Sequence, residues 1–136
     1  MYYESDYNND HIPLYIEKIA THVIERPYRI HSEFGPGLLE KSYEFCLFND
    51  LKDIGYTVEL QELLPIHYYG HKQEGAYRID LIVNDLLIVE IKATESYHPI
   101  HKSQLLTYLR TGGYRLGLLV NFNVVSLKGE IKRVVN

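Results

Sequence analysis

The sequence predicts an α/β fold, with a central mixed β-sheet flanked by helices. Apolar residues recur at helical spacing up to residue 54, change to extended runs over residues 56–93 and return to helical spacing over residues 97–111. A chain that changes between the two periods in this way covers a sheet with helices. Its 136 residues suit one domain. We therefore expect a flexible leader at residues 1–11 and a single domain at residues 12–136.

Two helical segments begin this domain. In residues 12–34 apolar side chains recur about every three or four positions, and Pro27 lies within the run. Proline removes a backbone donor and disrupts a helix interior, so we expect one broken helix or two short ones. Residues 38–54 predict a second helix, which follows the Phe-Gly-Pro-Gly breaker at residues 34–37 and is capped by Gly55.

The middle of the chain predicts extended structure. Residues 56–69 predict a strand pair or one long bent strand, which ends in a polar turn at residues 70–75. Residues 76–83 and 86–93 are rich in strand-forming residues, and an Asn-Asp pair typical of tight hairpin turns separates them. We therefore expect these two runs to form a central hairpin of the sheet.

The last third of the chain returns to a helix and then to strands. Helical spacing over residues 97–111 ends at a Gly-Gly pair, and residues 115–121 and 131–135 predict two further strands. The single cysteine, Cys46, excludes an internal disulfide bond. No stretch approaches the roughly 18 uninterrupted apolar residues of a membrane span. We therefore expect a cytoplasmic protein with no membrane partner.

Asp80, Glu90 and Lys92 are the candidate chemical residues. Glu90 and Lys92 are two apart in a predicted strand, so their side chains share one face while Ile91 points to the other. Asp80 comes four residues before the predicted turn and Glu90 five after it, which places them across the hairpin from each other. Converging carboxylates repel each other unless a cation lies between them, and hard oxygen ligands suit Mg²⁺ or Mn²⁺.

This pattern predicts a metal site held by two carboxylates. The backbone carbonyl of Ile91 could add a third ligand. Lys92, beside the metal, could position or deprotonate an attacking water or stabilise charge that develops on a phosphate, which is the chemistry of phosphodiester cleavage.

A plainer interpretation is that Asp80 and Glu90 face solvent and that Lys92 only pairs with Glu90. The apolar runs at residues 81–83 and 86–89 favour strands buried on both faces, where charged groups are costly without a purpose. The net charge of −4 counts against broad electrostatic binding of nucleic acid, which depends on lysine and arginine. A bound metal would add local positive charge that this count omits.

The D-x₉-E-x-K spacing of these three residues resembles that of the PD-(D/E)xK nuclease superfamily. Gln104 and Tyr108 resemble the Q-x-x-x-Y motif of its RecB-type branch, and residues 37–43, Gly-Leu-Leu-Glu-Lys-Ser-Tyr, resemble the signature of the small GxxExxY proteins. Together these segments cover about residues 34 to 133. The resemblance implies a restriction-endonuclease-like core. Ile79 stands where the superfamily name has proline, at a position that varies and touches no metal.

The resemblance also implies roles for individual residues. The two strand carboxylates would hold the metal and Lys92 would be catalytic. Glu40 would join the same catalytic metal site from the preceding helix, or would be only an exposed first-turn acid favoured by the helix dipole. Gln104 and Tyr108, four apart and so on one helical face, would orient the DNA phosphate or the lysine, unless Tyr108 belongs to the core. Tyr43 is expected in the core.

Two functions from different classes follow from these residues, and metal-dependent hydrolysis of some other phosphate ester is a third possibility that the residues alone leave open. The first is a Mg²⁺-dependent nuclease that hydrolyses phosphodiester bonds in DNA, with Mn²⁺ as another usable ion. The second is a non-catalytic module that keeps the nuclease fold and binds nucleic acid or protein. The first is favoured, because a binding module has no need to converge two carboxylates on a phosphate that they would repel.

Three basic residues flank the last motif and could contact a nucleic-acid backbone. They are Lys102, Arg110 and Arg115. A solvated surface role is the other interpretation of each. A homodimer is attractive at this size, because two sites would let a compact protein span a duplex.

Overall fold

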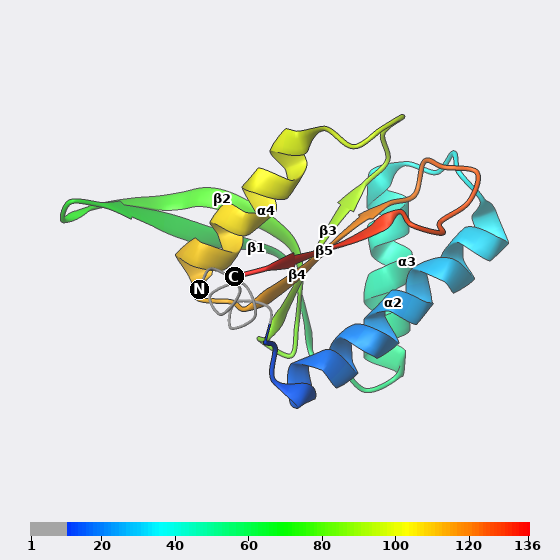
Figure 1. Ribbon diagram of the computed structural model, residues 1–136, viewed down its shortest axis with the longest axis horizontal. Helices are drawn as coiled ribbons and strands as arrows, with labels where there is room; N and C mark the ends of the chain where they lie inside the picture. Colours follow the sequence, from blue (N-terminus) through cyan, green and yellow to red (C-terminus); the bar gives the residue numbers. More distant parts are fainter. Residues whose placement is uncertain (1–10) are drawn as a thin grey trace, which may run out of the picture.

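The computed structural model describes residues 11–136, which form a five-stranded mixed sheet with helices on both faces (Figure 1). The elements are α2 (Leu14–Phe34), α3 (Glu40–Asp53), β1 (Val58–Tyr68), β2 (His71–Val83), β3 (Leu87–Lys92), α4 (Pro99–Gly112), β4 (Leu116–Asn121) and β5 (Ile131–Val135). The strands lie in the order β1-β2-β3-β4-β5, with β3 and β4 parallel and all other neighbours antiparallel. The predicted α/β fold is confirmed. The predicted leader lies outside the described residues, apart from His11.

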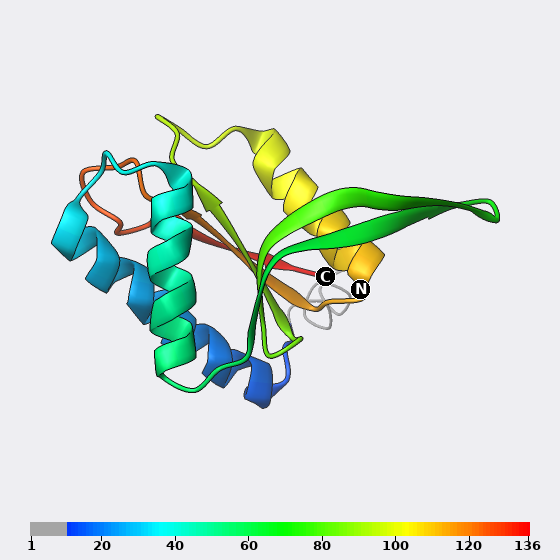
Figure 2. The same ribbon diagram turned by 180° about the vertical axis from the view of Figure 1, so that it is seen from behind.

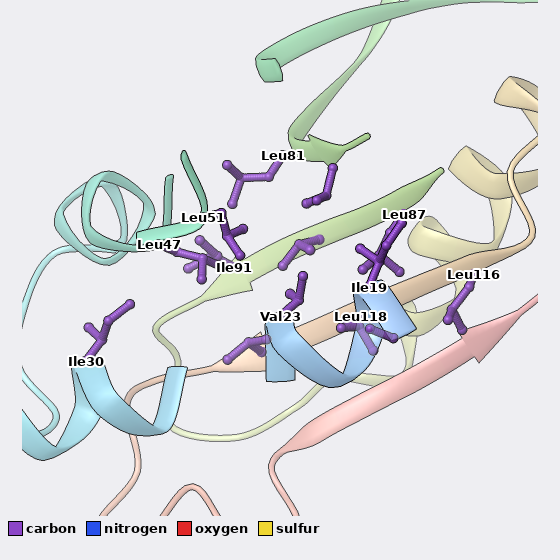
Figure 3. Close-up of a cluster of buried hydrophobic side chains, with 14 of the residues drawn as sticks. Ile19, Val23, Ile30, Leu47, Leu51, Leu81, Leu87, Ile91, Leu116 and Leu118 are labelled. Atoms are coloured by element: carbon purple, nitrogen blue, oxygen red, sulfur yellow. The ribbon is translucent and has the colours of Figure 1, made fainter. Parts of the chain in front are cut away.

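Each face of the sheet carries its own apolar core. Figure 3 shows the first, in which Leu87 and Ile91 of β3 lie with Ile19 of α2 and Leu47 of α3. Ile88 belongs to the second core, against α4. Because alternate residues of a strand point to opposite faces, the side chains that follow Ile88 at intervals of two also face α4. The candidate residues at positions 90 and 92 therefore lie on the α4 side of the sheet.

Helix α2 continues without interruption through Pro27, so the predicted break is wrong. Pro27 is part of the buried stripe of the helix. The other members of that stripe are Ile16, Ile19, Ala20, Val23 and Ile30. A proline in a helix interior costs about 3 kcal/mol, whereas each large apolar side chain gains about 1.5–3 kcal/mol on burial. Packing against the sheet thus outweighs the local penalty. No helix within residues 11–136 is long and apolar enough to cross a membrane.

A tight turn joins β2 to β3, as predicted. Asn84 and Asp85 have φ values of 52° and 55°, and this turn type requires positive φ at both central residues. The Asn84 side chain also accepts a hydrogen bond from the Thr57 N–H at 2.8 Å. The register that results pairs Leu81 with Val89. The hairpin of two central strands is confirmed.

Strands β1 and β2 form a long hairpin, and its outer half projects beyond the sheet and past α4 (Figures 1 and 2). The predicted turn at residues 70–75 is wrong, because residues 71–73 already pair with β1. Tyr69 and Gly70, with φ values of 43° and 83°, reverse the chain on their own. The polar residues after them are therefore free to extend β2. We call the outer half, residues 63–76, the arm.

Tyr43 fixes the loop before α3. Its side chain is fully buried, and its ring stacks on Phe122 with 4.2 Å between the ring centroids. Its hydroxyl donates to the Gly35 carbonyl at 2.5 Å and accepts from the Leu38 N–H at 3.1 Å. Gly37 has a φ of 122°, which glycine adopts without steric cost. Tyr43 is thus a core residue, as expected, and its hydroxyl holds the loop that leads into α3.

Candidate active site

The candidate site lies where β2 separates from β3. Pairing between the two strands ends at Leu81 and Val89, whereas β3 continues beside β4. Two side chains fill the gap. The Asp80 N–H donates to Glu90 Oε1 at 3.1 Å, and the Ile91 N–H donates to Asp80 Oδ2 at 2.9 Å. Each carboxylate accepts a hydrogen bond from a backbone N–H that no longer has a backbone acceptor on the neighbouring strand. These two hydrogen bonds place the side chains of Asp80 and Glu90 side by side.

Glu90 is the most deeply placed charged group of this site. Its exposed fraction is 6%. Burial, and after it the charge of Asp80, raises the pKa of Glu90 to about 9, although the Asp80 N–H and the nearby Lys92 favour the ionised form. The negative charge of this pair is therefore only partly balanced by the protein. A divalent cation between the carboxylates would restore the ionised form of Glu90.

Lys92 lies on the same face of β3 as Glu90, as the strand period predicted. Its charge acts on two groups: it favours the ionised form of Glu90 and, after burial, contributes to lowering the pKa of His101 on α4. The segment after Lys92 is fixed by the fully buried Asn121. The Thr94 N–H donates to Asn121 Oδ1 at 3.1 Å, and Asn121 Nδ2 donates to the Thr94 carbonyl at 2.9 Å. Asn121 was not predicted from the sequence.

The carbonyl of Ile91 points toward the same gap. In a strand the N–H and C=O of one residue point to the same neighbouring strand. The Ile91 N–H binds Asp80, so the Ile91 carbonyl also lies on the Asp80 side of β3. That the Ile91 carbonyl adds an oxygen ligand to a metal stays a prediction.

Helix α3 presents Glu44, rather than Glu40, to the strand carboxylates. The Gln61 amide donates to Glu44 Oε2 and, at 3.3 Å, to Asp80 Oδ1. Burial, and after it the charge of Asp80, raises the pKa of Glu44. Glu40 is exposed in the first turn of α3. Within residues 11–136 no three or more His, Cys, Asp or Glu side chains group as metal ligands, so the structure does not bring Glu40 together with Asp80 and Glu90.

Helix α4 places Tyr108 beside the two strand carboxylates. Burial raises the pKa of Tyr108, and the negative charges of both carboxylates raise it further. Its ring contacts that of Tyr77, with 5.0 Å between centroids. His101 and Gln104 lie on the same helical face as Tyr108, because spacings of three, four and seven return to one side of a helix. Gln104 is exposed, and His101 has a buried Nδ1 with no hydrogen-bond partner in the described part of the chain.

The three basic residues predicted to contact nucleic acid are not gathered at the site. The guanidinium of Arg115 donates to the carbonyls of Asn136 at 2.9 Å and His11 at 2.8 Å. Arg115 precedes β4 and therefore lies at the opposite end of the parallel strand pair from the candidate site. Lys102 and Arg110 are exposed on α4. Arg115 thus binds the backbone of residues 11 and 136. Lys102 and Arg110 are the two of the three whose side chains are exposed on α4, the helix that also carries Gln104 and Tyr108.

The raised pKa of Glu90 predicts that Glu90→Gln stabilises the metal-free protein above neutral pH. The folded-state pKa of about 9 lies above the ordinary value of 4.5, so the folded state holds this proton more tightly than the unfolded state. The free energy of unfolding must then fall as the pH rises from 4.5 to 9, by on the order of 3 kcal/mol at pH 7. Glutamine removes this penalty.

Urea unfolding at pH 5 and pH 8 measures this effect. We expect the difference in stability between Glu90→Gln and the wild type to increase from the lower to the higher pH. Glu95→Gln, at an exposed position, is the matched control and should follow the wild type. If the stability difference between Glu90→Gln and the wild type is no larger at pH 8 than at pH 5, burial does not raise the pKa of Glu90 as described.

Comparison with known families agrees with this geometry. The sequence profile of the PD-(D/E)XK nuclease superfamily matches residues 17–134, which include every residue of the candidate site. No curated protein and no solved structure matches the chain significantly. The narrower likenesses to the RecB-type branch and to the GxxExxY proteins remain predictions.

Proposed function

Because the chain belongs to the PD-(D/E)XK nuclease superfamily, we propose that it is a Mg²⁺-dependent nuclease that hydrolyses phosphodiester bonds in DNA. The observation that carries this proposal is the reciprocal arrangement of Asp80 and Glu90 at the strand divergence, with Lys92 on the same face as Glu90. Glu90 is buried and lies beside the half-buried Asp80, and two carboxylates in such a place are costly for the protein unless a bound cation makes use of them.

The donor set fits a hard divalent cation. Asp80, Glu90 and the Ile91 carbonyl supply only oxygen atoms, and Mg²⁺ in phosphate-processing sites uses one or two carboxylates and keeps several waters. Mn²⁺ accepts the same ligands. When bound, such an ion would lower the pKa of a bound water and neutralise charge on the phosphate.

The remaining site residues have complementary roles in this proposal. Lys92 would hold the attacking water, accept its proton when neutral, and as an ammonium stabilise the charge that grows on the phosphate oxygens. The water oxygen forms a bond to phosphorus, the opposite P–O bond breaks, and the leaving oxygen takes a proton from solvent. Gln104 and Tyr108 both carry hydrogen-bond donors and would orient the phosphate from α4.

One observation favours a second function, that of a non-catalytic binding module. The hydrogen bonds of Asp80 and Glu90 to the backbone already give both carboxylates a structural purpose, since they satisfy N–H groups at the strand divergence. In such a module neither carboxylate would need a metal. The two functions differ in whether Mg²⁺ changes what the protein does to DNA.

Removal of the metal is expected to abolish cleavage. The purified protein should cut fluorophore-labelled single-stranded or double-stranded DNA with Mg²⁺ or Mn²⁺, stop in excess chelator, and resume when the ion is restored. Asp80→Asn, purified in parallel, controls for contaminating nuclease and should yield no product. If the wild type cuts neither substrate under these conditions, the nuclease proposal fails and the binding module replaces it.

A further inference from the structure

A line of tyrosine rings leads away from the candidate site along the arm. Tyr108, beside the strand carboxylates, contacts Tyr77 of β2. Tyr77 lines a cavity of about 390 Å³ together with Tyr68 of β1 and Thr111 at the end of α4. Tyr68 contacts Tyr69 edge to face, with 4.8 Å between centroids. We call these four tyrosines the aromatic strip.

The outer rings of the strip, those of Tyr68 and Tyr69, belong to neither apolar core. Tyr68 is 67% exposed and Tyr69 is 88% exposed. The arm that carries them extends beyond the rest of the fold (Figures 1 and 2). Asp80 lies ten positions after Gly70 along the chain, a reach of about 33 Å in a strand. Adjacent large rings that remain exposed to solvent are typical of a binding surface.

The base of the arm is held firmly against α4. Leu64 pairs with Tyr77 across the hairpin. It also packs so closely on Gly112 that a Cβ at that glycine would lie 3.1 Å from Leu64 Cδ1. The inner part of the strip therefore keeps a fixed position relative to the carboxylates, and a ligand on the strip would be directed toward them.

The chemistry of the strip suits a single strand of nucleic acid. Bases of a single strand expose their faces, and tyrosine rings stack on any base without regard to sequence. A duplex hides those faces and is bound mainly through phosphates by lysine and arginine. The hairpin between residues 58 and 79 carries only two such residues, Lys72 and Arg78, against three glutamates, and Lys72 is paired with Glu74 at 2.9 Å. With so few basic residues on the hairpin, stacking on the tyrosines would supply the affinity, and only a single strand offers its base faces for stacking.

We propose that the aromatic strip binds single-stranded nucleic acid by base stacking and leads it to the Asp80–Glu90 site. This inference rests on the proposed function, because continuity with a site for phosphodiester chemistry is what identifies the occupant. It assigns the arm a role in choosing the substrate, so that a single strand or a frayed end is preferred to an intact duplex.

The test removes the two exposed rings without disturbing the hairpin. Tyr68→Thr keeps a residue that favours strands, and Tyr69→Asn keeps one that tolerates the φ of 43°. Both changes are made in the Asp80→Asn protein, so that no cleavage interferes. Fluorescence anisotropy with labelled oligothymidine should then show at least about tenfold weaker binding than the parent. Tyr15→Ala with Tyr28→Ala, exposed tyrosines of α2, is the matched control and should bind like the parent.

Binding and cleavage are measured separately, so the inference and the proposed function fail separately. Equal affinity of the arm variant and its parent for oligothymidine, or no binding by either, would overturn the inference even if the wild type cuts DNA. Tyrosine-dependent binding by a wild type that cuts nothing would support the inference and remove the nuclease proposal. If the arm substitutions change the sedimentation of the protein but not its affinity for oligothymidine, the strip is a contact between two copies of the chain. That result would also overturn the inference.

Discussion

Lys92→Met is expected to reduce Mg²⁺-dependent DNA cleavage by about 10²–10⁴-fold, the usual contribution of a positioned acid or base. Methionine keeps an unbranched side chain of similar length but has no ammonium, so neither the proton transfer nor the charge stabilisation proposed for Lys92 remains. Metal binding should persist. The two carboxylates are unchanged, and the substitution removes a positive charge that acts on Glu90 beside the cation site. Initial cleavage rates at saturating metal measure the effect.

Two further variants sharpen this result. Lys18→Met, at an exposed position of α2, is the matched control and should cleave like the wild type. Lys92→Arg retains a positive charge but cannot give up its proton near neutral pH, so it separates charge stabilisation from proton transfer. We expect it to remain strongly impaired. Full activity of Lys92→Met would remove Lys92 from the proposed mechanism.

The local part of the site could be predicted from the sequence because short-range rules decide it. The period of two in β3 puts Glu90 and Lys92 on one face, and the turn at Asn84 and Asp85 sets the register that brings Asp80 opposite. Both predictions needed only the neighbours of each residue along the chain. The order of helices and strands followed in the same way.

The errors occurred where distant parts of the chain decide the outcome. Pro27 stays helical because the sheet buries it, which no local propensity reveals. Gln61 reaches Asp80 from a backbone position with a φ of 55°, which glutamine seldom adopts and no pattern signals. One feature of the sequence could have indicated that Glu44 lies near the site. Glu44 is four residues after Glu40 and therefore lies on the same helical face.

The reach of the arm was also missed for a physical reason. Gly70 and Gly75 together suggested a long turn, but only Tyr69 and Gly70 reverse the chain. The polar residues between the glycines can pair as an exposed ribbon because neither of their faces needs to be buried. A polar stretch between two glycines is therefore not by itself a sign of irregular structure.

Asp80→Asn is expected to weaken metal binding at least about tenfold and to abolish cleavage. The amide is nearly the same size as the carboxylate, and its oxygen can still accept the hydrogen bond of the Ile91 N–H, so the strand geometry should survive. The variant lacks the charged ligand. Loss of even an outer hydrogen-bond partner of a ligand costs about 10–100-fold in metal affinity, so loss of a ligand itself should cost at least as much.

Calorimetric titration of Mg²⁺ and Mn²⁺ into the wild type, Asp80→Asn and Asp53→Asn tests most directly whether Asp80 and Glu90 hold one divalent ion. Asp53, exposed at the end of α3, is the matched control. We predict one bound ion per chain for the wild type and for Asp53→Asn, and at least about tenfold weaker binding for Asp80→Asn. Equal affinity of Asp80→Asn and the wild type would contradict the assignment of the metal to these two carboxylates.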